Sequence, residues 1–459
     1  MGYSIMPTVE DRALTYFVCN YNDGIRVPGE GFFDHLDLYY SSISATDPLV
    51  TSIKAVGLAG YAHHVQSTKL VNASRYQYIQ AVQLTNNALR SPEDAIKDST
   101  LISITILGMY ELLTGGTNRS LKAWAEHVNG AAALLKLRGI QQLATPMGRR
   151  LFAQVTNELV TTCLQRNMRL PEHIIQMVTS LGTLTEYNTR AVDVMVSIMN
   201  VNQFRAAVED KSITDPYAIL EKALELDGAL KAITDDPPSI WQYLTVSVPS
   251  AHPDEIFNGR CHIYKDPWSV NIWNGLRISR ILLHFRIRAT LLEGFAARPP
   301  AFTTSEYTVQ FQRSTDACYE LQAEILASIP QLLGFAPPSQ PSRNGLREET
   351  LYTQWDRRAE VAKAGRLMAG IDDPSDILTP PYTPQLRHSQ ALTSKPISVP
   401  HSNGYALLWP LWLAGDMDLA TPEVQQYCAR TLRRIARDLG ISQAKMLARA
   451  IESRMDIEF

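Results

Sequence analysis

The stretch SPEDAIKDSTLISITILGMYELL (residues 91–113), with TGGTNRS (114–120) and LKAWAEHVNGAAALLKLRG (121–139), determines the fold of this 459-residue chain. It predicts two helices joined by a glycine-rich turn. Ser91 is the predicted cap of the first helix, because its hydroxyl can accept a backbone N–H and Pro92 is favourable at the first helical position. Apolar positions then recur at three- and four-residue steps and form a face that needs a partner: Ile102, Thr105, Ile106, Met109 and Leu113.

The second helix supplies that partner. Ser120 is its predicted N-cap, and Gly139 is predicted to end it in a left-handed conformation. Gly130 lies in its middle, followed by three alanines. Since glycine inside a helix costs roughly 1 kcal/mol relative to alanine, we expect Gly130 to let a neighbouring helix approach closely. The apolar positions of this helix are Trp124, Val128, Ala131 and Leu135.

Helical spacing of apolar residues continues along most of the chain. Because no sequence repeat of equal period is present, the predicted fold class is all-α, an irregular multi-helix bundle or superhelix. The helix at 268–292 is apolar on nearly all sides, which is typical of a central helix in a large domain. Further helices are predicted at 11–21, 49–64, 72–89, 147–166, after Pro171, at 190–208, 217–234, 319–333 and 421–439, and from Ser442, and the chain is again apolar at 405–415.

The composition of the chain changes at Phe335. Between there and Gly404, prolines and serines recur in PPSQP, LTPPYTP and SKPISVP, which blocks regular backbone hydrogen bonding. We therefore expect a single large domain with an insertion: residues 1–335 form the helical domain, and residues 336–403 form a partly mobile surface excursion. Residues 404–459 supply C-terminal helices that complete the same domain.

The charge of the chain argues against direct binding to nucleic acid. The formal net charge is −3 and the estimated pI is about 6.4, so the chain lacks the basic footprint that phosphate backbones require. Arg430, Arg433, Arg434 and Arg437 form a row on the helix at 421–439, but Asp438 and Glu423 dilute it. A solvated helix face is the favoured interpretation of this row, with nucleic-acid binding as the alternative.

The sequence predicts no metal site, no cofactor and no membrane span. Its five cysteines are scattered and never two or three residues apart, whereas a local zinc cluster needs closely spaced thiolates. No run of about 20 apolar residues is present. The motifs HExxH, GxSxG, GxGxxG after a strand and GxxxxGK[ST] are also absent. This favours a protein that is not an enzyme, although it does not decide the question.

Two groups of residues are candidates for a ligand pocket. His127 lies one turn from Trp124 on the inward side of its helix, so it could contact a ligand between helices or be a core histidine bonded to a carboxylate or carbonyl. Glu111 ends an apolar helix and could pair with an arginine such as Arg138. In the helix at 268–292, Trp273, Asn274 and Arg277 could line a groove, although a tryptophan at helical spacing is usually part of a core.

These residues also carry a resemblance to a known family. The pattern in the central helix pair resembles the signature of the fungal-specific transcription factor domain: Asp98, Leu101, Tyr110, Glu111, Trp124, His127, Gly130, Ala131, Leu134, Leu135, Arg138 and Gly139. Weaker matches follow in the expected order over nearly the whole chain: Ala13, Leu14, Tyr16, Phe17, Tyr78, Leu84, Leu89, Trp241, Gln242, Tyr243, Trp273, Asn274, Arg277, Arg280 to Leu283, Ser328 to Pro330, Leu408 to Leu411, Ala414 and Gly415.

In this family the domain is the regulatory region of transcription factors that read DNA through a separate six-cysteine zinc cluster. Such a cluster is missing here, so the resemblance implies a regulator that acts through a protein partner, which is a DNA-reading regulator or a second copy. The alternative is a fragment of a longer product that carries the cluster. The regulator would control a metabolic or secondary-metabolite gene cluster. The resemblance further implies a small-molecule effector and a location in the nucleus, with the cytoplasm as a second location. We expect exposed apolar surface on the last helices to provide the protein contacts.

The alternative is a cofactor-free biosynthetic enzyme recruited from this fold. A cyclase or isomerase acting on a polyketide- or terpenoid-like metabolite needs an apolar cavity and a single acid or base. His127 or Glu111 could supply that group. The two hypotheses differ in what a deletion changes, since the first predicts lower transcript levels and the second predicts accumulation of an intermediate.

Overall fold

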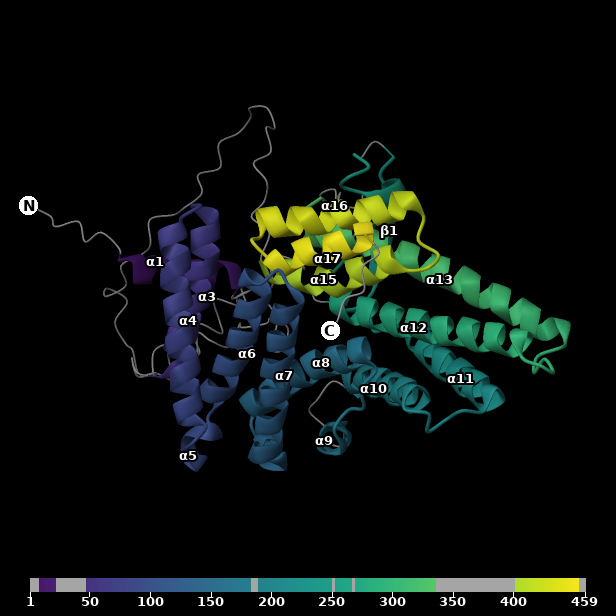
Figure 1. Cartoon of the computed structure of the whole chain (residues 1–459), viewed down its shortest axis with the longest axis horizontal. Helices are drawn as coiled ribbons and strands as arrows, with labels where there is room; N and C mark the ends of the chain where they lie inside the picture. The colour runs from purple at the N-terminus through teal and green to yellow at the C-terminus, as the bar shows by residue number, and fades with distance from the viewer. Residues whose placement is uncertain are drawn as a thin grey trace, which may run out of the picture. The chain divides into compact units, whose positions relative to one another are not determined.

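The computed structural model describes residues 8–21, 47–182, 189–249, 252–265, 269–335 and 401–453. Fifteen α-helices make up most of these residues (Figure 1), so the all-α prediction is confirmed. The first helices are α1 (Val9–Tyr21), α3 (Pro48–His64), α4 (Thr68–Ala88), α5 (Pro92–Ala95), α6 (Asp98–Thr114) and α7 (Asn118–Arg138). Then follow η1 (Ile140–Ala144), α8 (Pro146–Arg166), α9 (Glu172–Gly182), α10 (Thr189–Glu209) and α11 (Pro216–Asp235).

The second half contains a short hairpin and five more helices. The elements are β1 (Tyr243–Ser247), η2 (Phe257–Gly259), β2 (Arg260–Tyr264), α12 (Ser269–Ala296), α13 (Ser305–Leu332), α15 (His401–Asp416), α16 (Pro422–Asp438) and α17 (Ser442–Ser453). The two strands are antiparallel, and the sequence analysis assigned no element to them. Helix α13 begins 14 residues before its predicted start, because its first half is polar and carries little helical periodicity.

The central helix pair differs from the prediction at both N-termini. Ser91 caps the one-turn helix α5, and α6 begins separately at Asp98 after Lys97, whose backbone is extended. The Thr100 hydroxyl donates to the Asp94 carbonyl at 2.7 Å, which satisfies one of the carbonyls left free where α5 ends. In α7 the N-cap is Thr117, and Ser120 completes a capping box three residues later.

Close packing in this pair depends on a different glycine from the one predicted. A Cβ atom built on Gly130 would meet no atom within 4 Å, so Gly130 does not admit a neighbouring helix. A Cβ atom on Gly108 of α6 would lie 3.2 Å from the His127 Cβ and 3.4 Å from the Trp124 Cδ1. Gly108 therefore lets α7 lie close against α6.

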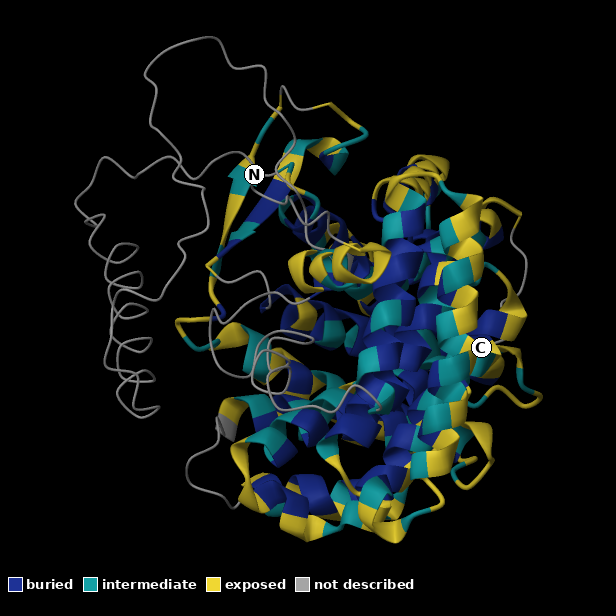
Figure 2. Ribbon diagram, turned by 90° about the vertical axis from the view of Figure 1, so that its left-hand side faces the viewer, coloured by how far each residue is buried: buried dark blue, intermediate teal, exposed yellow. Residues whose placement is uncertain are grey.

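Helix α12 is central in its part of the fold, as its apolar sequence indicates. It packs against α10, α11, α13 and α15, and both faces of the helix are buried along most of its length. Trp268, the first residue of the predicted helix, lies outside the described residues. Figure 2 shows the buried faces of the helices turned towards one another, with exposed residues at the rims and helix ends.

The C-terminal helices belong to the same compact unit as the helices before residue 336. Helix α15 packs against α1, α12 and α13, and α17 packs against α6. The proposed excursion at 336–403 lies outside the described residues except for His401–Asn403, which begin α15, so the three-part division of the chain stays a prediction. The N-cap of α16 is Thr421, as its sequence Thr421-Pro422-Glu423 predicts.

The expected apolar surface on the last helices is absent from the described part of α15, α16 and α17. Their apolar side chains turn inwards because each helix packs against at least two others. Exposed large apolar residues lie instead on α4, where Val71, Tyr76 and Ile79 share the solvent-facing side. Others lie further along the chain, for example Leu244 of β1 and Leu292 of α12, so exposed apolar area is not confined to one end of the fold.

Candidate functional site

Two of the candidate residues meet through a tyrosine that the sequence analysis did not select. The Tyr78 hydroxyl of α4 donates to the Glu111 Oε1 of α6 at 2.5 Å, and its oxygen lies 3.4 Å from the His127 Nε2 of α7. With the phenolic proton directed at the carboxylate, we assign the Nε2–H tautomer to His127, which then donates to the Tyr78 oxygen. Tyr78 thus joins three helices through one hydroxyl.

Packing fixes the position of Tyr78. Its ring stacks on that of Tyr110, with centroids 4.3 Å apart and an angle of 11° between the planes. The Tyr110 hydroxyl in turn lies 3.2 Å from the Ser74 Oγ. Trp124 is half-buried beside Gly108 and completes the cluster on the α7 side. We call Tyr78, Glu111, Trp124 and His127 the tyrosine cluster.

The partner predicted for Glu111 is wrong. Arg138 forms an ion pair with Asp98 at the start of α6, whereas Glu111 lies in the last turn of that helix, far along its axis from Asp98. His127 contacts a hydroxyl group and not the carboxylate or carbonyl expected of a core histidine. Both differences have one cause. Tyr78 lies on a third helix, α4, and the sequence pattern of α6 and α7 contains no information about its side chains.

Burial keeps two members of the tyrosine cluster, Tyr78 and His127, in their neutral forms. Burial lowers the pKa of His127 to about 4, so its ring is uncharged near neutral pH. Burial and the neighbouring Glu111 raise the pKa of Tyr78 far above that of a free phenol. Neither group can exchange a proton readily near pH 7. Tyr78 and His127 are therefore suited to hydrogen bonding with each other and with Glu111.

The stability of the protein should depend on pH through His127. Above pH 6.5 the histidine is neutral in both states. As the pH falls towards about 4, only the unfolded state takes up the proton, so the free energy of unfolding decreases. This contribution amounts to at most about 3 kcal/mol. His127→Gln should therefore flatten the profile between pH 6.5 and 4, measured by urea unfolding. His64→Gln, which changes an exposed histidine, is the control, and identical profiles for both variants would contradict the assignment.

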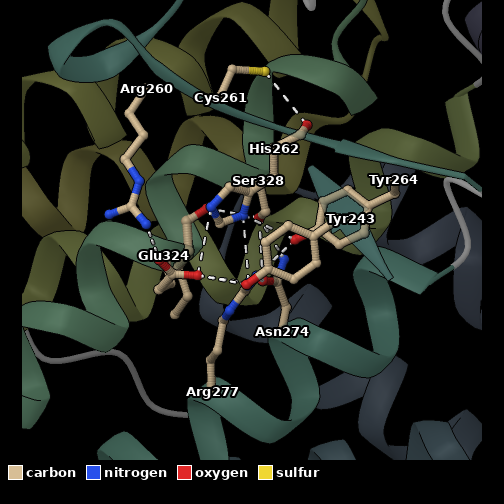
Figure 3. A network of polar contacts seen from close by, with 10 residues as sticks. Tyr243, Arg260, Cys261, His262, Tyr264, Asn274, Arg277, Glu324 and Ser328 are labelled. Carbon is tan, nitrogen blue, oxygen red and sulfur yellow. Dashed lines mark hydrogen bonds and ion pairs between the residues drawn. The ribbon is translucent and has the colours of Figure 1, made fainter. Parts of the chain in front are cut away.

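The other three candidates, Trp273, Asn274 and Arg277, are buried on α12. Figure 3 shows Asn274 and Arg277 in a second network of polar contacts. The Arg277 guanidinium, 3% exposed, donates to Tyr264 Oη at 2.9 Å, Asn274 Oδ1 at 3.1 Å and Tyr243 Oη at 3.1 Å. It also pairs with the Glu324 carboxylate of α13 at 3.2 Å. One arginine of α12 thus links the hairpin, its own helix and α13. We call this the arginine network.

Trp273 and Asn274, which are close to Arg277 on α12, also hold neighbouring elements against that helix. The Trp273 Nε1 donates to the Trp241 carbonyl at 2.8 Å, and the Asn274 Nδ2 donates to the Ser328 Oγ at 3.1 Å. Burial and the adjacent Arg277 lower the pKa of His262 to about 3. Trp273, Asn274 and Arg277 are therefore enclosed between elements, and they do not line an open groove among the described residues.

The sequence contained an indication that Glu324 and Arg277 form a pair. Glu324 lies among Leu321, Ile325 and Ser328 on the buried side of its helix, and Arg277 lies on a helix that is otherwise apolar. A carboxylate and a guanidinium on the buried sides of two helices indicate an ion pair, since burying an isolated charge is too costly. Tyr78 is one of the weaker family matches, but its sequence carried no sign of a partner on another helix.

The arginine row on α16 is paired with carboxylates. Arg430 contacts Asp254, and Arg433 contacts Glu452. Arg434 and Arg437 both contact Asp438, at 3.4 and 2.7 Å. This arrangement agrees with a solvated helix face and leaves little unpaired positive charge for a phosphate backbone.

The described residues lack two further kinds of feature. They contain no group of three or more histidine, cysteine or acidic side chains that could hold a metal ion. None of their helices has the length and hydropathy needed to cross a membrane. All five cysteines are free thiols, and only Cys19 is exposed.

Comparison with known proteins agrees with the resemblance found in the sequence. A curated relative, transcription factor dbaG of Emericella nidulans, is 21% identical over 463 residues, which cover 96% of this chain and 92% of the relative. No solved structure matches the chain. The model of the fungal specific transcription factor domain matches residues 27–233, the part that contains the central helix pair and the tyrosine cluster. Residues 27–233 therefore belong to the fungal specific transcription factor domain family.

Proposed function

We propose that this chain is a transcription regulator that acts through a DNA-reading protein partner and controls a metabolic or secondary-metabolite gene cluster. The observation that carries the proposal is the family match over residues 27–233, supported by a relative that is described as a transcription factor and aligns over 96% of this chain. The nucleus is the location that this role requires. Binding of DNA through a partner is consistent with the net charge of −3.

Features of the surface support action through a partner. The arginines of α16 are paired with carboxylates, so this helix is a poor match for a DNA backbone. Val71, Tyr76 and Ile79 of α4 expose apolar area of the kind that protein partners bury. The tyrosine cluster is the position that we propose for a small-molecule effector. Its half-buried Trp124 offers an aromatic surface, and Glu111 and His127 offer hydrogen bonds.

A deletion strain tests the proposed function. Transcripts of the neighbouring genes and the metabolite profile should be followed together, with the wild-type gene reintroduced as the control. We expect those transcripts to fall and to recover on complementation. If the transcripts hold steady while one intermediate accumulates, the proposal fails and the enzyme hypothesis takes its place.

A binding measurement with the purified chain tests the need for a partner. We expect no salt-dependent binding to duplex DNA, because the net charge is −3 and the arginines of α16 are paired with carboxylates. Fluorescence anisotropy at low and moderate salt checks this, with Arg433→Gln and Arg437→Gln as matched variants of the arginine row. Tight binding by the wild-type chain that both variants weaken would contradict the proposal.

A further inference from the structure

We infer that two copies of this chain associate through the outer edge of β1, forming one four-stranded antiparallel sheet across a two-fold axis. This inference goes beyond the proposed function and does not depend on it. It rests on the register of the hairpin, the free backbone groups of β1, the anchoring of the strand and the match of its sequence with itself.

The register shows which backbone groups of β1 point away from β2. The strands pair Tyr243 with Tyr264 and Ser247 with Arg260. The next pair is Val248 with Gly259, and it is hydrogen-bonded, because the Val248 N–H donates to the Gly259 carbonyl at 2.6 Å. In antiparallel pairs, hydrogen-bonded and non-hydrogen-bonded positions alternate. The N–H and C=O groups of the alternate residues therefore face outwards from β1: Tyr243, Thr245 and Ser247.

The two outer edges of the hairpin differ in whether their backbone groups are hydrogen-bonded. At the outer edge of β2, the Gln331 side chain accepts from the Tyr264 N–H at 2.7 Å and donates to the Tyr264 carbonyl at 2.9 Å, as a neighbouring strand would. Within the described residues, the outward groups of β1 have no such partner. Leu244 of β1 is 70% exposed. Figure 2 shows the exposed strand beside the more buried one.

The edge of β1 is also held in position before any partner binds. The Tyr243 hydroxyl donates to Glu324 at 2.8 Å and accepts from Arg277, which attaches the start of the strand to α12 and α13 (Figure 3). Two residues earlier, the Trp241 carbonyl accepts from Trp273. A fixed strand loses little conformational freedom on pairing, which favours association.

The sequence of β1 is complementary to itself in one register. With Thr245 opposite Thr245 of a second copy, Tyr243 lies opposite Ser247, and all three outward-facing positions form hydrogen-bonded pairs. Leu244 then lies opposite Val246 of the other copy, so two apolar cross-strand pairs form on one face of the sheet.

Natural edge strands are usually protected by lysine, proline or a bulge. The strand YLTVS has no charge and no proline, and its ladder with β2 is continuous. No like charges within β1 oppose the self-paired register, and an isologous contact of this kind closes after two copies. Because a five-residue strand buries less area than a standard interface, the dimer should be concentration-dependent.

Sedimentation velocity of the full chain over a series of concentrations is the first test. We expect a monomer–dimer equilibrium for the wild type. Leu244→Lys should abolish it by placing charge at the apolar pair, and Thr245→Pro should abolish it by removing an outward N–H without breaking the ladder with β2. Leu292→Lys is the matched control, since Leu292 is 52% exposed on α12, and it should dimerise like the wild type. Thermal unfolding of each variant checks that the fold is intact.

A cross-link tests the register itself. In a hydrogen-bonded antiparallel pair the Cα atoms lie about 5.5 Å apart, within the range of a disulfide. Thr245→Cys should therefore form a disulfide-linked dimer under mild oxidation, whereas Leu244→Cys, opposite a valine, should form much less. The wild-type chain treated in parallel corrects for Cys19.

Several outcomes overturn the inference. It fails if the wild type is monomeric at every concentration, or if it dimerises equally well with Leu244→Lys and Thr245→Pro, which would assign the dimer to another surface. It also fails if Leu244→Cys cross-links as readily as Thr245→Cys. The result is independent of transcript levels in a deletion strain, so failure here and failure of the proposed function can be told apart.

Discussion

Replacing Arg277 with methionine is expected to lower the free energy of unfolding by about 3–5 kcal/mol, because it leaves the largely buried Glu324 carboxylate without its buried partner. The guanidinium is 3% exposed and pairs with Glu324, whose pKa it keeps below the ordinary value although burial acts to raise it. The substitution also removes a donor from three neighbours, Tyr243, Tyr264 and Asn274. Urea unfolding monitored by circular dichroism measures the change.

A second arginine on the same carboxylate is the matched control. Arg260 also pairs with Glu324, but its side chain is 45% exposed. Arg260→Met should cost no more than about 1 kcal/mol, since exposed ion pairs contribute little. The double variant Arg277→Met with Glu324→Met should recover part of the loss, because the only charge left without its partner is the exposed Arg260 guanidinium. Equal losses for the two single variants would contradict a dominant role for burial.

Replacing Gly57 with alanine should destabilise the protein by about 1–3 kcal/mol through overpacking. A Cβ atom at this position would lie 2.1 Å from the Ala13 carbonyl oxygen and 2.8 Å from its carbon. These are backbone atoms of α1, so the contact can be relieved only if α1 moves away from α3. The same urea unfolding experiment measures the loss.

The matched control for Gly57 is the glycine that the sequence analysis selected. Gly130 is also inside a helix, and its Cβ position is empty to 4 Å. Gly130→Ala should therefore raise the free energy of unfolding by about 0.5–1 kcal/mol, the intrinsic helix preference of alanine. Effects of the same sign at both positions would show that packing between α1 and α3 is looser than the structure indicates.

Spacing within single segments was enough to predict most helices and the fold class. Helices such as α8 and α16 need only their own sequence, since apolar residues at three- and four-residue steps choose the buried face and a threonine followed by proline marks the start. The same local patterns identified α12 as a central helix. A resemblance spread over many weak motifs then indicated the family.

Features that depend on a second segment could not be predicted in this way. Glycines at 57 and 130 look alike in sequence, and only the neighbouring helix distinguishes them. The partner of Glu111 is Tyr78, 33 residues earlier, although an arginine nearer in the chain carried the opposite charge.

The break before α6 was also missed, because it is stabilised by a hydrogen bond from Thr100 back to Asp94. The hairpin was missed because residues of α12 and α13, Arg277 and Glu324, hold it in place. The sequence of this protein by itself determined which residues turn inwards, since burial of apolar area acts along each helix separately. Only the tertiary structure decided which polar groups meet, because hydrogen bonds and ion pairs depend on distances between segments far apart in the chain.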